Sequence, residues 1–231
     1  MTSRSTIVVY GFIMASIAGN RLPKADAADP TRFEKAIRAF EQQDKKQPPP
    51  EAATLFLGSS SIRLWPLDTS FPTRPKIHRG FGGSTIADSV HYADRIVIPY
   101  RPKQIVFYAG DNDVAAGMSA KDVTADFGKL TAKVFAALPE TTIVFISIKP
   151  SIQRWKLADV MKEINENVKQ MAAKEPRIRF VDVWPAMLGP DGKPIADLFV
   201  ADGLHLSPKG YELWTSLIEQ TLNDLENSTS K

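Results

Sequence analysis

The chain alternates short apolar runs with longer stretches in which apolar residues recur every three or four positions. The apolar runs cover Ala53–Leu57, Gln104–Ala109, Thr141–Ile148 and Arg177–Val183. Runs such as IVFYA and IVFISI contain no alternating polar residues, a pattern typical of parallel strands that are covered on both faces. These four runs are therefore predicted to be buried strands.

The stretches between the runs have helical periodicity. They cover Ser84–Val97, Ala120–Leu138, Arg154–Ala173 and Ser207–Leu225. Helices alternating with doubly buried strands predict an α/β fold, namely a three-layer α/β/α sandwich around a mostly parallel sheet of about five strands. There is no internal repeat and no low-complexity tract, so a single domain is expected over residues 28–231.

One further helix is predicted near the N-terminus. Asp29 can accept from the first free N–H groups and Pro30 suits the first helical position. Phe33, Ile37 and Phe40 then follow at helical spacing. The helix cannot continue through Pro48–Pro50, because proline lacks the N–H that the helical ladder needs.

Residues 1–27 resemble a secretory leader. Arg4 precedes an apolar stretch from Thr6 to Gly19, and a polar stretch then ends in Ala25-Asp26-Ala27. This is the order of a signal peptide with a small-residue cleavage site. The protein is therefore expected to be exported, to the periplasm or outside the cell, with an uncleaved N-terminal anchor as the alternative. No second such stretch follows, so no stable membrane span is expected after cleavage.

Composition narrows the chemistry further. The 231 residues are 43% hydrophobic and 24% charged, as in ordinary globular proteins. The chain contains no cysteine, which excludes a disulfide, a thiolate nucleophile and a cysteine–zinc site. The net charge of +3 is too small to indicate nucleic-acid binding, and cleavage of the leader would lower it to +1, because three basic residues and one acidic residue would leave.

Ligands of such sheets bind beyond the carboxyl ends of the strands, and polar motifs follow the predicted strands. Gly58-Ser59-Ser60-Ser61 follows the first strand. A hydroxyl at a strand-to-helix turn lies beside free helical N–H groups, which suits a nucleophile. A plain helix cap explains the serines equally well at this point.

Two further motifs offer hydrogen-bond donors. A second run reaches Arg79-Gly80-Phe81-Gly82-Gly83-Ser84, where glycines let the backbone approach a ligand. Asp111-Asn112-Asp113 follows the next strand, and an Asn amide there can donate to a developing oxyanion. Each motif could also be an ordinary turn. The two carboxylates could bind a metal, but no cluster of histidines accompanies them, so no metal and no cofactor is expected.

The last motif is Asp202-Gly203-Leu204-His205, shortly before a helix start at Ser207-Pro208. Across one turn, Asp202 can hold the Nδ1–H of His205 and leave Nε2 free as a base. A histidine near a helix cap can also be purely structural. The agreement of four motifs at one edge of the sheet favours the catalytic interpretation.

Together these motifs resemble the SGNH hydrolases, also called the GDSL esterase/lipase family, over about residues 53 to 225. The resemblance implies a flavodoxin-like SGNH fold and a Ser-His-Asp carboxylic ester hydrolase. It implies that Ser60 is the nucleophile, His205 the base and Asp202 its partner. It also implies that the backbone N–H groups of Ser60 and Gly83 and the side chain of Asn112 stabilise the oxyanion.

Two departures from the family pattern bear on these assignments. Ser59 occupies a position where the family often has Asp, so Ser59 and Ser61 compete chemically with Ser60 as the nucleophile. An Asn that often precedes the second glycine motif is absent, and His78-Arg79 lies there instead.

The expected partner is a small-molecule or carbohydrate ester with a short, acetyl-like acyl group, because no long apolar stretch suggests a membrane-docking lid. The irregular segment Trp184–Val200 is long enough to form a wall of the site. Trp184 and Phe199, with Phe81 opposite, are candidate substrate-binding residues, although they could equally pack beneath the loop.

Three alternatives stay open at this point. The first is lysophospholipase or thioesterase activity in the same family. The second is a non-catalytic carbohydrate- or ligand-binding module on the same fold. The third is a metal-dependent phosphoesterase built on Asp111, Asp113 and His205.

Overall fold

The computed structural model describes residues 29–229. The five strands are β1 (Thr54–Gly58), β2 (Lys76–Gly80), β3 (Gln104–Tyr108), β4 (Thr142–Ile146) and β5 (Ile178–Val181). They form one parallel sheet in the order β2-β1-β3-β4-β5. The predicted leader over residues 1–27 lies outside the described residues and stays a prediction.

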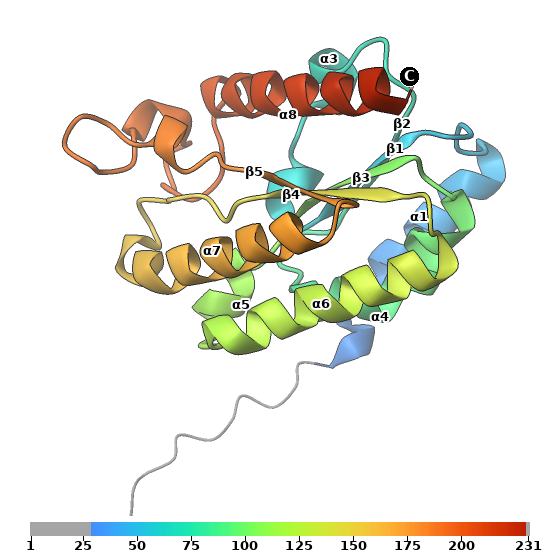
Figure 1. The fold of residues 1–231 in the computed structure, drawn as a ribbon, viewed down its shortest axis with the longest axis horizontal. Coiled ribbons are helices and arrows are strands. Elements are labelled where there is room, and N and C mark those ends of the chain that lie inside the picture. The colour runs from blue at the N-terminus through green and yellow to red at the C-terminus, as the bar shows by residue number, and fades with distance from the viewer. Residues whose placement is uncertain (1–28, 230–231) are drawn as a thin grey trace, which may run out of the picture.

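Helices cover both faces of the sheet (Figure 1). The α-helices are α1 (Glu34–Lys46), α2 (Ser60–Arg63), α3 (Leu67–Ser70), α4 (Ile86–Ile96), α5 (Asp111–Ala115), α6 (Ala120–Ala137), α7 (Ala158–Lys174) and α8 (Pro208–Thr229). Short 3-10 turns are η1 (Pro30–Phe33), η2 (Ile98–Tyr100), η3 (Trp155–Leu157), η4 (Pro185–Met187) and η5 (Ala196–Leu198). The predicted α/β/α sandwich is confirmed.

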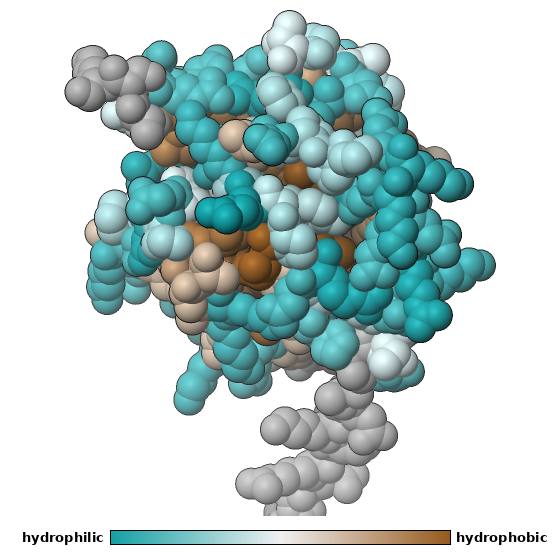
Figure 2. Space-filling model, turned by 90° about the vertical axis from the view of Figure 1, so that its right-hand side faces the viewer, coloured by the Kyte–Doolittle hydropathy of each residue, from teal (hydrophilic) through white to brown (hydrophobic). Residues whose placement is uncertain are grey.

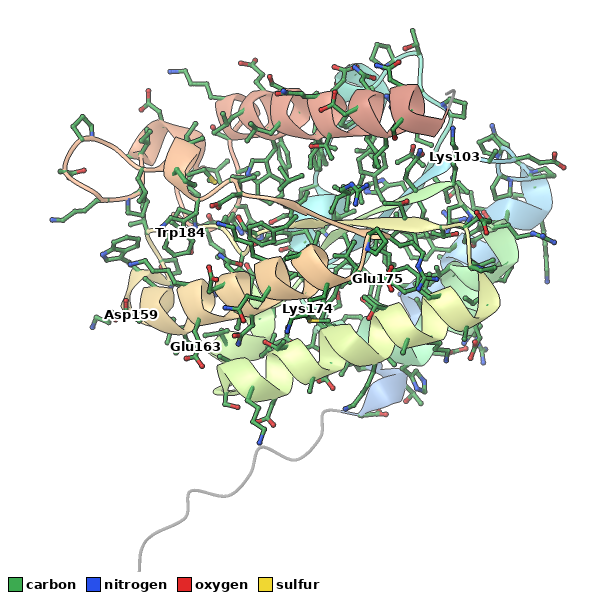
Figure 3. The ribbon with its side chains drawn as sticks, in the orientation of Figure 1. Lys103, Asp159, Glu163, Lys174, Glu175 and Trp184 are labelled. Atoms are coloured by element: carbon green, nitrogen blue, oxygen red, sulfur yellow. The ribbon has the colours of Figure 1, made fainter. Side chains whose placement is uncertain are left out.

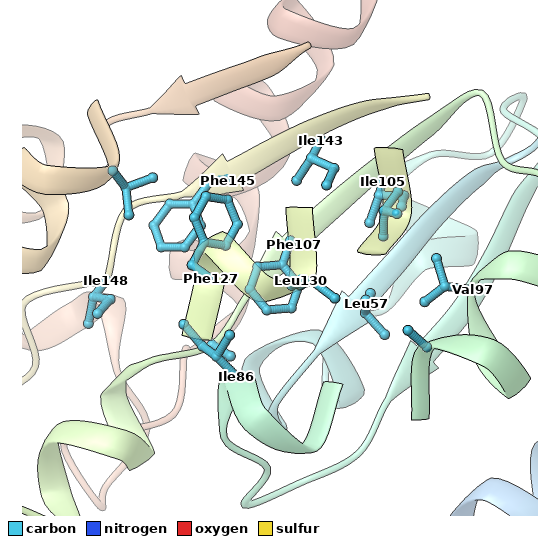
Figure 4. Packing of buried hydrophobic residues seen from close by; sticks show 14 of the residues in the cluster. Leu57, Ile86, Val97, Ile105, Phe107, Phe127, Leu130, Ile143, Phe145 and Ile148 are labelled. Carbon is cyan, nitrogen blue, oxygen red and sulfur yellow. The ribbon is translucent and has the colours of Figure 1, made fainter. Parts of the chain in front are cut away.

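Two apolar cores hold the layers together. The face that carries α4, α6 and α7 buries a cluster with Phe107, Phe127 and Phe145 near its centre (Figure 4). On the other face, Trp214 of α8 packs against Trp65 with the ring centroids 5.6 Å apart. Both faces of each central strand are therefore covered, which explains why those strands lack polar alternation.

The predicted boundaries agree with the structure to within a few residues. Asp29 caps η1 by accepting from the Thr31 N–H at 2.8 Å, and α1 ends at Lys46, before the three prolines. Thr85 and Asp88 form a reciprocal cap on α4. Strand β2 was not among the four predicted strands, because this edge strand is only partly buried and its sequence KIHRG is polar.

One face of the surface is seen in Figure 2. This is the face on the right-hand side of Figure 1, where Lys103 is labelled in Figure 3. It is largely hydrophilic, with a hydrophobic patch near its centre (Figure 2). Within residues 29–229, none of the helices combines the length and the apolar character that a bilayer span requires.

Candidate active site

Ser60 lies at the junction between the interior strand β1 and the short helix α2. The strand ends at Gly58, the Ser59 N–H donates to the Tyr108 carbonyl at 2.9 Å, and Ser60 is the first residue of α2. Ser59 and Ser61 are fully buried, whereas Ser60 is partly exposed and lines a pocket. Of the three adjacent serines, Ser60 alone presents its hydroxyl to that pocket.

A chain of hydrogen bonds connects Ser60 to the loop before α8. The Ser60 Oγ lies 3.0 Å from His205 Nε2, and His205 Nδ1 lies 2.6 Å from Asp202 Oδ2. The serine and the histidine are 145 positions apart in the sequence. With Nδ1–H donated to the carboxylate, Nε2 is left as an acceptor for the serine proton. This is the arrangement of an activated serine nucleophile.

The tight turn around Asp202 fixes the carboxylate. Its Oδ1 accepts the backbone N–H groups of Leu204 at 2.8 Å and His205 at 2.9 Å. The hydrogen bond from the His205 side chain, followed by these two N–H groups, lowers the pKa of Asp202 to about 2. Gly203 permits the turn because its φ is +64°, in the left-handed region. The carboxylate is therefore ionised and oriented at neutral pH.

Hydrogen-bond donors lie beside the serine. Among residues 29–229, the backbone N–H groups of Ser60 and Gly83 have no acceptor. Gly83 has a φ of +84° and lies in the loop between β2 and α4. Ser60, Gly83 and Asn112 all line the same pocket. The structure thus brings together the three groups that the sequence indicated as oxyanion donors.

The Asn112 side chain has a fixed orientation. Its Nδ2 donates to the Ser84 carbonyl at 3.0 Å, while its Oδ1 accepts from Arg154 Nη2 at 2.9 Å. Because a guanidinium can only donate and a carbonyl can only accept, these partners determine which end of the amide is which. The second hydrogen of Nδ2 stays available to a ligand in the pocket.

Sequence reasoning missed a buried charged cluster next to these donors. Asp111 Oδ2 lies 3.2 Å from Lys149 Nζ and 3.1 Å from Arg154 Nη1. Lys149 also donates to Ser61 Oγ at 3.2 Å and Tyr108 Oη at 3.0 Å. Burial alone would raise the pKa of Asp111, but the two cations outweigh it and hold that pKa below its usual value.

A signal for part of this cluster was present in the sequence. Lys149 directly follows a buried apolar run, so the rule that singled out the other motifs applied to it as well. Arg154 carries no comparable signal, because it lies in a loop and reaches Asn112 from 42 positions away.

Ser60 and His205 open into a pocket of about 740 Å³. Its lining combines polar and apolar side chains and includes residues of η1 and α1 at the N-terminal end of the domain. The lining residues are Phe33, Ala36, Ala39, Phe40, Ser60, Arg63, Gly80, Phe81, Gly82, Gly83, Asn112, Arg154, Leu204 and His205. Phe81, a predicted substrate-binding residue, is among them.

The other two predicted substrate-binding residues lie elsewhere. Trp184 is buried beyond the end of β5, where its ring stacks on Trp155 at 6.2 Å and lies near Lys162 (Figure 3). Phe199 is buried in the core beneath α8 and pairs its backbone with Leu206. The structure corrects their assignment to the pocket wall, because burial of these large rings beneath the loop stabilises the loop instead.

The carboxylates after β3 are engaged by partners within the protein. Asp111 contacts two cations, and Asp113 is fully buried and accepts the Ile86 N–H at 3.0 Å. Over the described residues, no group of three or more His, Asp or Glu side chains is placed to hold a metal ion.

Comparison with known proteins places these residues in a family context. Residues 64–213 match the GDSL-like Lipase/Acylhydrolase family, a stretch that includes Gly83, Asn112, Asp202 and His205. Ser60 lies four positions before it.

Individual similar proteins share between 18% and 27% of their sequence with this chain. The chain is 27% identical over 176 residues to platelet-activating factor acetylhydrolase IB subunit alpha1 of Bos taurus, covering 73% of each chain. Among solved structures, it is similar to a GDSL-like lipase from Bacteroides thetaiotaomicron, with a TM-score of 0.67 and 23% identity over 85% of this chain and 98% of that one. A carbohydrate esterase family 3 protein from Talaromyces cellulolyticus gives a TM-score of 0.61 and 18% identity over 76% and 99%. These two structures share the fold.

Proposed function

Because this chain belongs to the GDSL-like lipase/acylhydrolase family, we propose that it is a serine ester hydrolase that acts on short-acyl, acetyl-like esters through an acyl-enzyme. The observation that carries the proposal is the hydrogen-bonded series from Asp202 through His205 to Ser60, which opens into a pocket that Gly83 and Asn112 also line. Binding modules need neither an activated hydroxyl nor an ionised partner for the histidine.

The first half of the reaction forms the acyl-enzyme. Ser60 Oγ attacks the ester carbonyl while His205 Nε2, 3.0 Å away, takes its proton. Asp202 stabilises the resulting imidazolium through the bond to Nδ1. The negative charge on the carbonyl oxygen is met by the N–H groups of Ser60 and Gly83 and by the Asn112 amide.

The second half regenerates the enzyme. His205 gives its proton to the leaving alkoxide, so the alcohol departs neutral. A water molecule then attacks the acyl carbonyl, again losing its proton to His205, and the acid leaves when Ser60 recovers its hydrogen. The same oxyanion donors serve both steps.

The names of two similar proteins support this substrate class. The bovine relative is named an acetylhydrolase, which supports the acetyl group, and the fungal structure a carbohydrate esterase, which supports a carbohydrate ester. The substrate class proposed for this chain is therefore acetyl-like esters of small alcohols or carbohydrates.

The test is hydrolysis of 4-nitrophenyl acetate, butyrate and octanoate by the full-length chain and by Ser60→Ala. We expect activity that falls with acyl length and disappears in Ser60→Ala. Ser59→Ala is the matched control, because Ser59 Oγ is buried and has no hydrogen-bond partner within the described residues. Activity that persists in Ser60→Ala, or that is absent from the parent chain with all three esters, contradicts the proposal.

A second variant examines the oxyanion assignment. Asn112→Ala removes one donor, and a single donor of this kind is worth about 10²–10³ in kcat. The loss should be in kcat, because the donor acts on charge that develops in the transition state. An unchanged kcat would show that the Asn112 amide does not face the reacting oxygen.

A further inference from the structure

The N-terminal helix α1 forms one wall of the pocket that contains Ser60. Phe33, Ala36, Ala39 and Phe40 recur at helical spacing and all line this pocket. They lie before residues 64–213, the stretch that matches the family, so family membership does not account for them. We call these four side chains the α1 wall.

The α1 wall is an apolar surface in contact with solvent. Ala39 is exposed and the other three residues are partly exposed, whereas Ile37, one turn from Phe33 and Phe40, is fully buried in the core. The wall therefore has apolar area that a ligand can still cover. From Phe33 to Phe40 it extends about 10 Å, at 1.5 Å per helical residue.

Charged contacts fix α1 against the rest of the domain. Arg95 of α4 pairs with Glu34 and Glu41, each at 2.7 Å. Asp44 near the end of the helix pairs with Arg79 and accepts the Tyr100 hydroxyl at 2.6 Å.

An aromatic contact joins the α1 wall to the loop between β2 and α4, which contains Gly83. The Phe33 ring meets the edge of Phe81 with the ring centroids 5.2 Å apart, and Phe81 lies two positions before Gly83. The wall is therefore a built part of the pocket, held in a defined place relative to Ser60.

We propose that the α1 wall binds an apolar group on the alcohol side of the ester and so determines which alcohol the enzyme accepts. This inference rests on the proposed function, in which the acyl group is acetyl-like and too small to cover the wall. When a linear alkyl group moves from water onto this surface, each methylene contributes a favourable transfer free energy. Full burial of a methylene corresponds to about fourfold in affinity.

The experiment uses pairs of isomeric esters that differ only in which side carries the chain. Butyl acetate is compared with ethyl butyrate, and hexyl acetate with ethyl hexanoate, with ethyl acetate as the common reference. Isomers have nearly equal hydrophobicity, so a difference within a pair reports the side that the pocket prefers. Acid release by the full-length chain is followed with a pH indicator.

We expect kcat/KM to rise about two- to fourfold per methylene along the acetate series and to stay level or fall along the ethyl ester series. Relative to ethyl acetate, kcat/KM should therefore be higher for butyl acetate and higher again for hexyl acetate.

Variants of the helix connect the gain to the wall. Ala36→Trp and Ala39→Trp should each fill this part of the pocket, so that most of the gain in kcat/KM from ethyl acetate to hexyl acetate is lost. Gln42→Trp is the control, because Gln42 is exposed on the same helix and does not line the pocket. Two independent wall variants keep the test valid if one of them folds poorly.

The outcomes separate this inference from the proposed function. Ser60-dependent hydrolysis without a gain for longer alcohols, or with a gain that both wall variants retain, overturns the α1 wall as the alcohol site. A gain along the ethyl ester series instead overturns the assignment to the alcohol side. Hydrolysis that is absent, or independent of Ser60, overturns the proposed function itself.

Discussion

Asp113 offers a quantitative test of the electrostatics behind the site. It follows Asn112 on α5, is fully buried, and accepts the N–H of Ile86 at the start of α4. Its second oxygen has no partner within residues 29–229. Burial raises the pKa of Asp113 from 3.8 to about 7, although the Ile86 N–H opposes this.

The perturbation is Asp113→Asn, which keeps the acceptor for Ile86 and removes the ionisation. Because the folded protein holds the Asp113 proton more tightly than the unfolded chain does, the free energy of unfolding falls as pH rises from about 4 to about 7. At about 1.4 kcal/mol for each tenfold change in proton affinity, the full loss is about 4 kcal/mol. Above pH 7 the whole loss is present.

The assay is urea unfolding at pH 4.5, 6 and 8, followed by tryptophan fluorescence. Asp113→Asn should be close to the parent at pH 4.5 and more stable at pH 8, by up to about 4 kcal/mol. Asp159→Asn makes the same chemical change at a fully exposed carboxylate and is the control variant. If Asp113→Asn follows the parent curve at all three pH values, or is less stable at pH 8, Asp113 does not carry the burial cost assigned to it.

Two more predictions concern the stability of the strand ends that carry the site. Gly58→Ala should lower the free energy of unfolding by at least about 3 kcal/mol, because φ is +142° and a Cβ would lie 1.9 Å from a carbonyl oxygen of β3. Gly117→Ala is the control, because Gly117 has a φ of +84° but no atom within 4 Å of the added Cβ. In thermal unfolding, Gly117→Ala should cost clearly less. Asp111→Asn should cost about 3–5 kcal/mol, because it leaves the buried Lys149 and the partly buried Arg154 without their carboxylate. Lys149→Met should cost less in urea unfolding, since Asp111 keeps Arg154, and the reverse order would contradict a stabilising role for Asp111.

Local chemistry explains why so much of the fold could be predicted. The uninterrupted apolar runs of β3 and β4 appear in the sequence because both faces of a central parallel strand are buried. The start of η1 at Asp29-Pro30 depends on a cap within the same few residues. The edge strand β2 was not predicted, because a partly buried strand can have a polar sequence such as KIHRG.

Several site residues could also be indicated from sequence alone. Parallel strands bring their carboxyl ends to one edge, so Ser60, Gly83, Asn112 and His205 were expected near one another before any distance was known. Asp202 and His205 share one turn, and their contact depends only on three-residue spacing.

By itself, then, the sequence determined the four apolar strands and the long helices between them, the strand-end motifs and the pairing of Asp202 with His205, all of which follow from neighbours in the chain. Only the tertiary structure decided that Arg154 orients Asn112, that Trp184 packs on α7 instead of lining the pocket, and that α1 forms the apolar wall. These depend on side chains tens of positions apart, whose contacts arise from the packing of whole helices on the sheet. No local periodicity encodes such contacts, because the same apolar residue satisfies a core and a pocket wall equally well.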